Sequence, residues 1–154
     1  MHPTKACPVV VRRGPLGDEV LVFRHPTAGV QLVKGTIEAG ESPGAAALRE
    51  LAEEAGLVDA ELGHSLGVWE SGFESQVWEF FEVEVHGALP ERWRHHAPDD
   101  GGQEFNFHWH PLAENPSSEW HSLFVRALAF IGVNRRRVRS ELSSGGLTSS
   151  CSGP

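Results

Sequence analysis

One predicted helix carries a cluster of charged side chains that suits metal chemistry: Arg49, Glu50, Glu53 and Glu54. At about 100° per residue, the three carboxylates project from one side of this helix, and Leu51 projects from the other. Like charges at such spacing destabilise an isolated helix by a few tenths of a kcal/mol per pair. Arg49 can offset only one of them, so a bound divalent cation is a candidate for neutralising the rest.

The same helix has a second interpretation, an acidic and solvated outer face, because glutamate is a strong helix former. The helix alone leaves both interpretations open. The preceding loop favours a site, since Gly35, Gly40 and Gly44 flank Glu41. This composition predicts a compact turn that brings the Glu41 carboxylate close to the start of the helix.

The segment from Gly35 to Leu57, GTIEAGESPGAAALRELAEEAGL, resembles the Nudix box, G-x5-E-x7-R-E-U-x-E-E-x-G-U, in which U is a bulky aliphatic residue. Every specified position is filled at the required spacing, by Gly35, Glu41, Arg49, Glu50, Leu51, Glu53, Glu54, Gly56 and Leu57. The order of predicted strands around the box is also similar to that of the family. A chance match is a poor explanation for so complete a motif.

The resemblance implies an α/β protein with the Nudix fold, an α/β/α sandwich with a mixed β-sheet. It also implies hydrolysis of a diphosphate linked to another moiety, with Mg2+ or Mn2+ on the glutamates and water attacking phosphorus. Carried over to this chain, Glu50 and Glu54 are the principal metal ligands and Glu53 is a further one. Arg49 and Glu41 orient the cluster. The general base varies within the family, and Glu50 is our candidate. The metal would neutralise a polyanionic substrate, acidify a bound water and clamp the phosphorus.

Residues outside the acidic helix are further candidates. Members of this family often recruit another acid, and Glu104, just before a predicted strand, is the candidate fourth metal ligand; the alternative is a solvated loop residue. Lys34 and Gly35 at the box entrance, and Arg24 at a strand end, are candidates for substrate binding. Lys34 and Arg24 are otherwise ordinary surface cations. Trp93 is a candidate for stacking on a base or sugar, or else a core residue.

Alternating apolar patterns and turn residues predict a layered α/β domain with a mixed sheet. The strands are expected at 7–13, 19–24, 30–33, 62–69, 76–86 and 104–110, and the helices at 44–55 and 117–131. Ser42 and Pro43 suit the N-cap and first turn of the first helix, and Gly56 suits its end. Residues 87–102 are expected to be irregular. We expect one Nudix domain over 1–139 and a flexible tail over 140–154.

The charge distribution argues against a nucleic-acid partner for the domain. The net charge is −8, but the chain from Arg126 onward holds five arginines and one acid, so the first 125 residues carry 8 basic and 20 acidic side chains. Such a domain repels a phosphate backbone. The run from Arg135 to Arg139 is either a contact for RNA or another phosphate-rich ligand, or a solvated helix end.

Other features indicate a cytoplasmic protein without a membrane partner. No stretch approaches the roughly 20 apolar residues of a membrane span. The amino-terminal segment does not resemble a signal peptide. Cys7 and Cys151 are expected to be free thiols. Homodimers are frequent in the family, so a homodimer is a further expectation from the resemblance.

Three functions are open at this stage. The first is a metal-dependent pyrophosphohydrolase acting on a nucleoside diphosphate linked to another moiety. Lys34-Gly35 resembles the form seen in dinucleoside polyphosphate hydrolases, which favours that substrate class. The second is a sensor that binds a nucleotide-like ligand without turnover, although degenerate members usually lose box glutamates. The third is an RNA-processing role through the arginine run.

Overall fold

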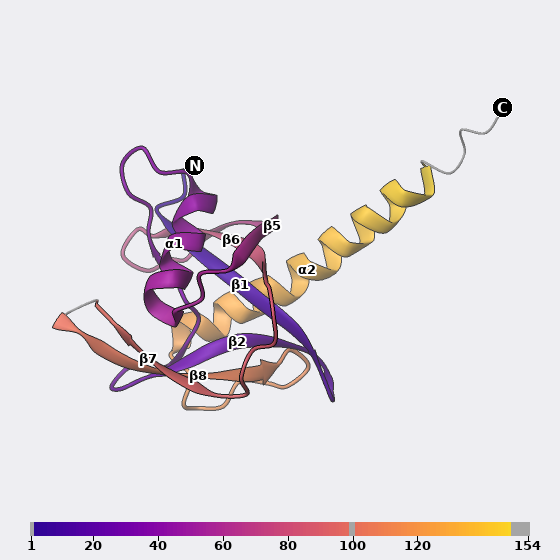
Figure 1. The fold of residues 1–154 in the computed structure, drawn as a ribbon. Helices are drawn as coiled ribbons and strands as arrows, with labels where there is room; N and C mark the ends of the chain where they lie inside the picture. Colours follow the sequence, from indigo (N-terminus) through magenta and orange to yellow (C-terminus); the bar gives the residue numbers. More distant parts are fainter. Residues whose placement is uncertain (1, 99–100, 149–154) are drawn as a thin grey trace.

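The computed structural model describes residues 2–98 and 101–148, with side chains described through residue 144 (Figure 1). Two helices and eight strands make up this part of the chain. The helices are α1 (Pro43–Ala55) and α2 (Ser122–Thr148). The strands are β1 (Lys5–Gly14), β2 (Gly17–His25), β3 (Gly29–Gln31), β4 (Gly35–Thr36), β5 (Ala60–Glu70), β6 (Val77–Val85), β7 (Trp93–Ala97) and β8 (Gln103–Pro111).

The strands form one mixed sheet in the order β5-β6-β1-β2-β8-β7, with β3 beside β2 and β4 beside β1. β1 and β6 run parallel, and the other pairs within the described ranges are antiparallel. This arrangement confirms the mixed sheet expected from the sequence. It also places β4, which opens the glycine-rich loop, against the start of the central strand β1.

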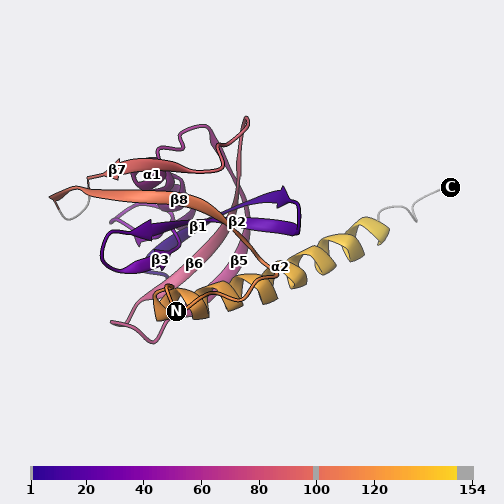
Figure 2. The same ribbon diagram turned by 90° about the horizontal axis from the view of Figure 1, so that it is seen from below.

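The helices cover opposite faces of the sheet (Figure 2). Along β1, Cys7 and Val9 belong to the buried cluster that contains the apolar side of α2, whereas Val10 belongs to the cluster that contains Leu51 of α1. Successive side chains of a strand point to opposite faces, so a valine-rich strand can supply both layers. The structure therefore confirms an α/β/α sandwich. Cys7 is a buried free thiol, and Cys151 lies outside the described residues.

Local capping fixes both ends of α1. The Ser42 hydroxyl accepts a hydrogen bond from the Ala45 amide at 3.1 Å, and Pro43 opens the first turn. At the other end Gly56 has φ 73° and donates its N–H to the Ala52 carbonyl at 3.0 Å. A left-handed residue is most easily a glycine. Both predicted helix signals are confirmed.

The prediction of an irregular segment over residues 87–102 was wrong, because β7 lies within it and pairs with β8. Within this polar stretch, inward-facing and exposed side chains alternate along β7. Trp93 packs against the core on one side, and Arg94 is exposed on the other. This segment is a strand because it pairs with β8. The local sequence gives no sign of that pairing.

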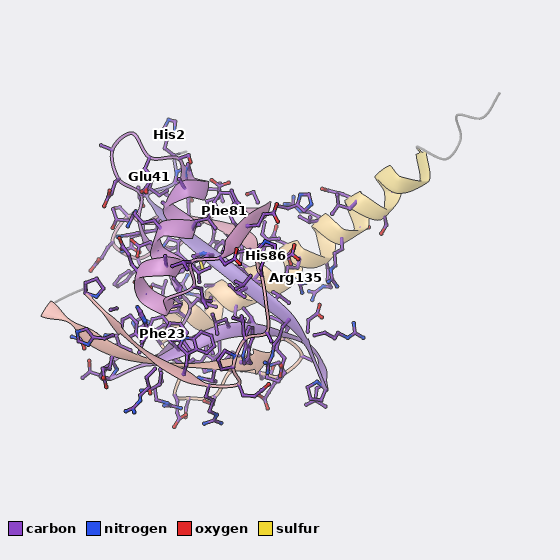
Figure 3. The ribbon with its side chains drawn as sticks, in the orientation of Figure 1. His2, Phe23, Glu41, Phe81, His86 and Arg135 are labelled. Atoms are coloured by element: carbon purple, nitrogen blue, oxygen red, sulfur yellow. The ribbon has the colours of Figure 1, made fainter. Side chains whose placement is uncertain are left out.

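The second helix also differs from its prediction, since it begins at Ser122 and continues through Thr148. Arg135 is 8% exposed and binds Glu82 of β6 and Asp18 of β2, and Arg139 binds the same Asp18 at 3.2 Å (Figure 3). These ion pairs hold the middle of α2 against the strands. The helix then projects from the body of the molecule (Figure 1).

The expected tail over 140–154 is therefore helical as far as residue 148, and its last residues, 149–154, lie outside the described part. Side chains 140–144 are exposed, so the domain boundary at 139 stays a prediction. Neither described helix combines the length and apolar character that a membrane span needs.

Replacing Arg135 tests the ionic attachment of α2. Arg135→Ala should lower the free energy of unfolding by about 2 kcal/mol, because it removes the buried cation beside Glu82 and leaves Asp18 with only the exposed Arg139. Arg136→Ala, which removes an exposed arginine from the same helix, is the control and should change stability by less than about 0.5 kcal/mol. Urea denaturation measures both. Equal stability of the two variants would contradict this account.

Candidate active site

A polar cleft of about 490 Å³ lies between α1 and the loop that precedes it. The residues that line it are Lys5, Lys34, Gly35, Thr36, Glu38, Arg49, Glu50, Glu53 and Glu54. The structure therefore brings together the acidic residues of the helix and the two residues at the box entrance. Glu41 lies in the loop before α1 (Figure 3) and does not line the cleft.

Helix periodicity alone predicted that the glutamates lie opposite the core and face solvent. The structure shows a different arrangement. Glu50 is 7% exposed and Glu54 is 6% exposed, and only Glu53 is substantially open to solvent. The reason is tertiary: β4 and its loop cover a side of α1 that would otherwise face water. The alternative interpretation, a solvated acidic face, is wrong for Glu50 and Glu54.

Arg49 connects the helix to the loop. Its Nε and Nη2 donate to the two oxygens of Glu41 at 2.8 and 2.9 Å, and Nη2 also donates to the Thr36 carbonyl at 2.9 Å. The paired contacts with Glu41 form the planar fork that arginine makes with a carboxylate. This geometry fits the orienting role that we expected for Arg49 and Glu41.

The remaining nitrogen of Arg49 faces the acidic cluster. Nη1 donates to Glu50 Oε1 at 2.9 Å and to Glu53 Oε2 at 3.2 Å. One guanidinium thus compensates three carboxylates and stays protonated, with its pKa raised by the hydrogen bond to Glu41. The hydrogen bond from Arg49, followed by that from the Glu38 backbone N–H, lowers the pKa of Glu41 to about 2.

Gly35 is required by close packing against Glu50. A side chain at position 35 would overlap the Glu50 carboxyl group, and the glycine therefore leaves the space in which that carboxylate sits. The glycine at the first position of the box is thus explained by its contact with Glu50 of the helix rather than by an unusual φ. Sequence spacing alone does not reveal this contact.

Lys34 lies where the cleft meets a second, smaller pocket of about 210 Å³. Lys34 and Glu54 line both cavities. Burial, followed by the nearby charge of Lys5, lowers the pKa of Lys34. The smaller pocket has an aromatic side, in which the rings of Phe23 and Phe105 stack with centroids 4.3 Å apart.

Three other candidates lie outside the cleft. Glu104 is exposed on β8, and its neighbour Gln103, not Glu104, lines the pocket beside Glu54. Arg24 forms an ion pair with Glu119 at 2.8 Å. Trp93 stacks on Phe107 with centroids 5.1 Å apart. The roles predicted for these residues at the catalytic cleft receive no support from their positions and stay predictions.

Sequence reasoning missed Lys5 and His95, and it did not predict the contact that Trp93 makes with α1. Lys5 at the start of β1 contributes a second cation to the cleft, and its Nζ donates to Thr36 Oγ1 at 2.6 Å. On β7, Trp93 Nε1 donates to the Ala55 carbonyl at 3.1 Å, and His95 Nε2 lies 2.9 Å from the Glu53 carbonyl. These side chains satisfy carbonyls at the end of α1. The alternation in residues 93–97 was the available signal.

The donor set of the cleft suits a hard divalent cation, because Glu50, Glu53 and Glu54 supply carboxylate oxygens. Over residues 2–98 and 101–148, no three acidic, histidine or cysteine side chains already form a complete metal-binding arrangement. Glu50 and Glu53 instead both accept hydrogen bonds from Arg49. Lys5 and Lys34, which line the same cleft, suit phosphates bound beside such a cation.

Comparison with known proteins identifies the family and the fold of this chain. The chain matches the family model of the NUDIX domain over residues 2–128. Among solved structures, an ADP-ribose pyrophosphatase of Streptococcus suis has a TM-score of 0.61 at 15% identity, covering 84% of this chain and 90% of that one. An Ap4A hydrolase of C. elegans has a TM-score of 0.57 at 18% identity, covering 91% and 98%. These similarities show the fold.

A curated relative, an octanoyltransferase of Myxococcus xanthus, is 43% identical over 74 residues, which are 44% of this chain and 21% of that protein. The chain thus spans about a fifth of the length of that relative. The family assignment rests on the domain match, which covers most of the chain and includes the whole box. The chain belongs to the Nudix family.

Gly35→Ala tests the close packing against Glu50. The added methyl group should displace the Glu50 carboxylate and lower the free energy of unfolding by about 2 kcal/mol. Gly132→Ala is a matched control on α2, where the added atom would approach only Arg136 Nη1, at 3.7 Å. It should be neutral or stabilising by up to about 1 kcal/mol. Calorimetric unfolding compares the two, and a Gly35→Ala protein as stable as wild type would contradict the packing argument.

The pKa of Glu41 predicts a specific acid sensitivity. The folded state lowers this pKa from 4.5 to about 2, so the folded chain binds fewer protons than the unfolded chain between these values. The stabilising contribution of Glu41 is therefore complete above pH 4.5 and is lost as pH falls towards 2.

Glu41→Gln should flatten the dependence of unfolding free energy on pH within that window. Glu70→Gln, an exposed glutamate on β5, is the control and should leave the slope unchanged. Urea denaturation at a series of pH values measures this slope. Identical slopes in wild type and Glu41→Gln would show that the Arg49–Glu41 pair does not supply the effect.

Proposed function

We propose that this Nudix-family protein is a metal-dependent pyrophosphohydrolase that cleaves a nucleoside diphosphate linked to another moiety. The observation that carries the proposal is the junction of two cavities at Lys34 and Glu54. The polar cleft suits the phosphates. The adjoining pocket, with its stacked Phe23 and Phe105, suits a flat ring attached to them.

The roles of the cleft residues follow from their positions. Lys34 and Lys5 would bind phosphate oxygens from the side of the cleft opposite the helix. Glu50, Glu53 and Glu54 would hold Mg2+ or Mn2+, which supplies positive charge at the diphosphate and lowers the pKa of a bound water. Glu50 is our candidate for accepting the proton of the attacking water. Arg49, fixed by Glu41, keeps the carboxylates Glu50 and Glu53 oriented.

Within this class we propose a dinucleoside polyphosphate-like substrate. The Lys34-Gly35 pair at the box entrance supports this choice, and a hydrolase of Ap4A is among the proteins with a similar fold. Proteins of similar fold also include a UDP-X diphosphatase. A cytoplasmic location, a homodimer and the absence of a nucleic-acid or membrane partner accompany this proposal as predictions.

The test is turnover of nucleoside triphosphates, dinucleoside polyphosphates, nucleotide sugars and diphosphoinositols, with products separated by chromatography. We expect hydrolysis only with Mg2+ or Mn2+. Glu54→Gln should reduce kcat/KM by about a hundredfold or more, because it removes a charge while preserving size. Glu70→Gln changes the net charge equally at an exposed site and should remain within about twofold of wild type.

Three results would contradict the proposal in different ways. Turnover without added metal, in the presence of a chelator, would exclude the metal-dependent reaction. Ligand and metal binding without turnover of any compound would favour the sensor. Preferential cleavage of capped RNA, lost in an Arg136→Gln/Arg137→Gln variant, would favour the RNA-processing alternative.

A further inference from the structure

A second polar groove lies away from the catalytic cleft, across β2, β8 and β7. Its volume is about 530 Å³, and its polar side chains are Arg24, Arg92, Arg94, Asn106 and His108. None of these residues lines the cleft that holds the glutamates. The groove and the cleft are therefore separate sites.

Strand register places the groove on the face of the sheet opposite α1. Arg24 pairs with Asn106, which pairs with Arg94, so the three form one row across the three strands. The adjacent row, Phe23 with Phe107 and Trp93, packs into the buried cluster that contains α1. Neighbouring rows of a sheet point to opposite faces. A substrate held by the glutamates would have to cross the sheet to reach these arginines.

The groove concentrates positive charge in an acidic protein. It gathers three of the 13 basic side chains of a chain that has 21 acidic ones. Arg24 is paired with the exposed Glu119. For Arg92 and Arg94, the described part of the chain provides no ion pair within 4.0 Å. Guanidinium groups placed together without compensating carboxylates favour an anion, and phosphate oxygens match their donor geometry.

The other polar groups of the groove suit the same ligand. His108 is half-buried on β8, and its burial, followed by the charge of Arg24, lowers its pKa. Burial thus favours the uncharged form of the imidazole. Asn106 adds amide donors in the centre of the row. Positive charge in the groove thus comes from arginines, which stay protonated at any physiological pH.

The Trp93 ring packs with the row that faces α1, on the other side of the sheet from the arginine row. That ring stacks on Phe107 at an interplanar angle of 11°, and its Nε1 is bound to the Ala55 carbonyl. Recognition would therefore depend on phosphates. Arg24 and Arg94 are two strand spacings apart, about 10 Å between backbones, which suits linked phosphates better than a single one.

From these observations we infer that the groove is a second anion site, which binds a chain of two or more linked phosphoryl groups independently of the catalytic cleft. The ligand is an inorganic polyphosphate or the polyphosphate part of a small molecule. This inference does not depend on the proposed hydrolase activity, because the groove shares no residue with the cleft.

Calorimetric titration of the full chain with tripolyphosphate, in EDTA so that no metal links the ligand to the cleft, tests the inference. We expect one site per chain. Arg92→Gln/Arg94→Gln should weaken binding by about tenfold or more. Arg136→Gln/Arg137→Gln has the same change in net charge on exposed positions of α2 and should stay within about twofold of wild type. Glu54→Gln should also bind normally, which separates this site from the cleft.

Two further ligands identify what the groove recognises. ATP should bind with an affinity similar to that of tripolyphosphate, because phosphates and not the base are contacted. A short single-stranded RNA that binds more tightly through Arg92 and Arg94 would overturn the small-anion assignment in favour of a nucleic-acid surface. Absence of tripolyphosphate binding, or equal weakening in both arginine double variants, would overturn the site itself. Unchanged thermal unfolding of each variant excludes misfolding as the cause.

Discussion

The guanidinium of Arg49 is the interaction on which the architecture of the cleft depends. Carboxylates on adjacent turns of one helix repel one another, and two of them here are removed from bulk water. Arg49 relieves this repulsion by bonding to Glu50 and Glu53, while its fork with Glu41 ties the loop to the helix. The same contacts therefore stabilise the loop and orient the groups proposed to bind metal.

Close packing on both sides of α1 makes that arrangement possible. Gly35 brings the backbone of β4 against the Glu50 carboxylate, where any side chain would collide. At the other end of the helix, Trp93 and His95 of β7 meet the Ala55 and Glu53 carbonyls. The acidic helix is thus held at its start by a loop and at its end by an edge strand. Its buried carboxylates are accommodated because these elements leave a polar cavity beside them.

The sheet separates two sites of opposite character. Acidic groups line the cleft on the side of α1, and arginines line the groove on the other side. Two arginines of the run on α2 have a different use, since Arg135 and Arg139 bind Asp18 and attach α2 to the strands. Neither the net charge nor runs of charged residues in the sequence therefore predict where charge lies on the surface. Alternate residues of a strand lie on opposite faces of the sheet.

The amino-acid sequence by itself determined the Nudix family, the mixed sheet, the caps of α1 and the group of acidic residues at the cleft. These features depend on short-range spacing: a complete box over Gly35–Leu57, alternation within strands, and Ser42 and Gly56 at the helix ends. Only the tertiary structure decided that Glu50 and Glu54 are buried, that β7 is a strand, and that α2 continues past Ile131. Each of these depends on partners distant in the chain, such as β4 over α1 or Glu82 beside Arg135. Helical periodicity and local composition carry no information about such contacts.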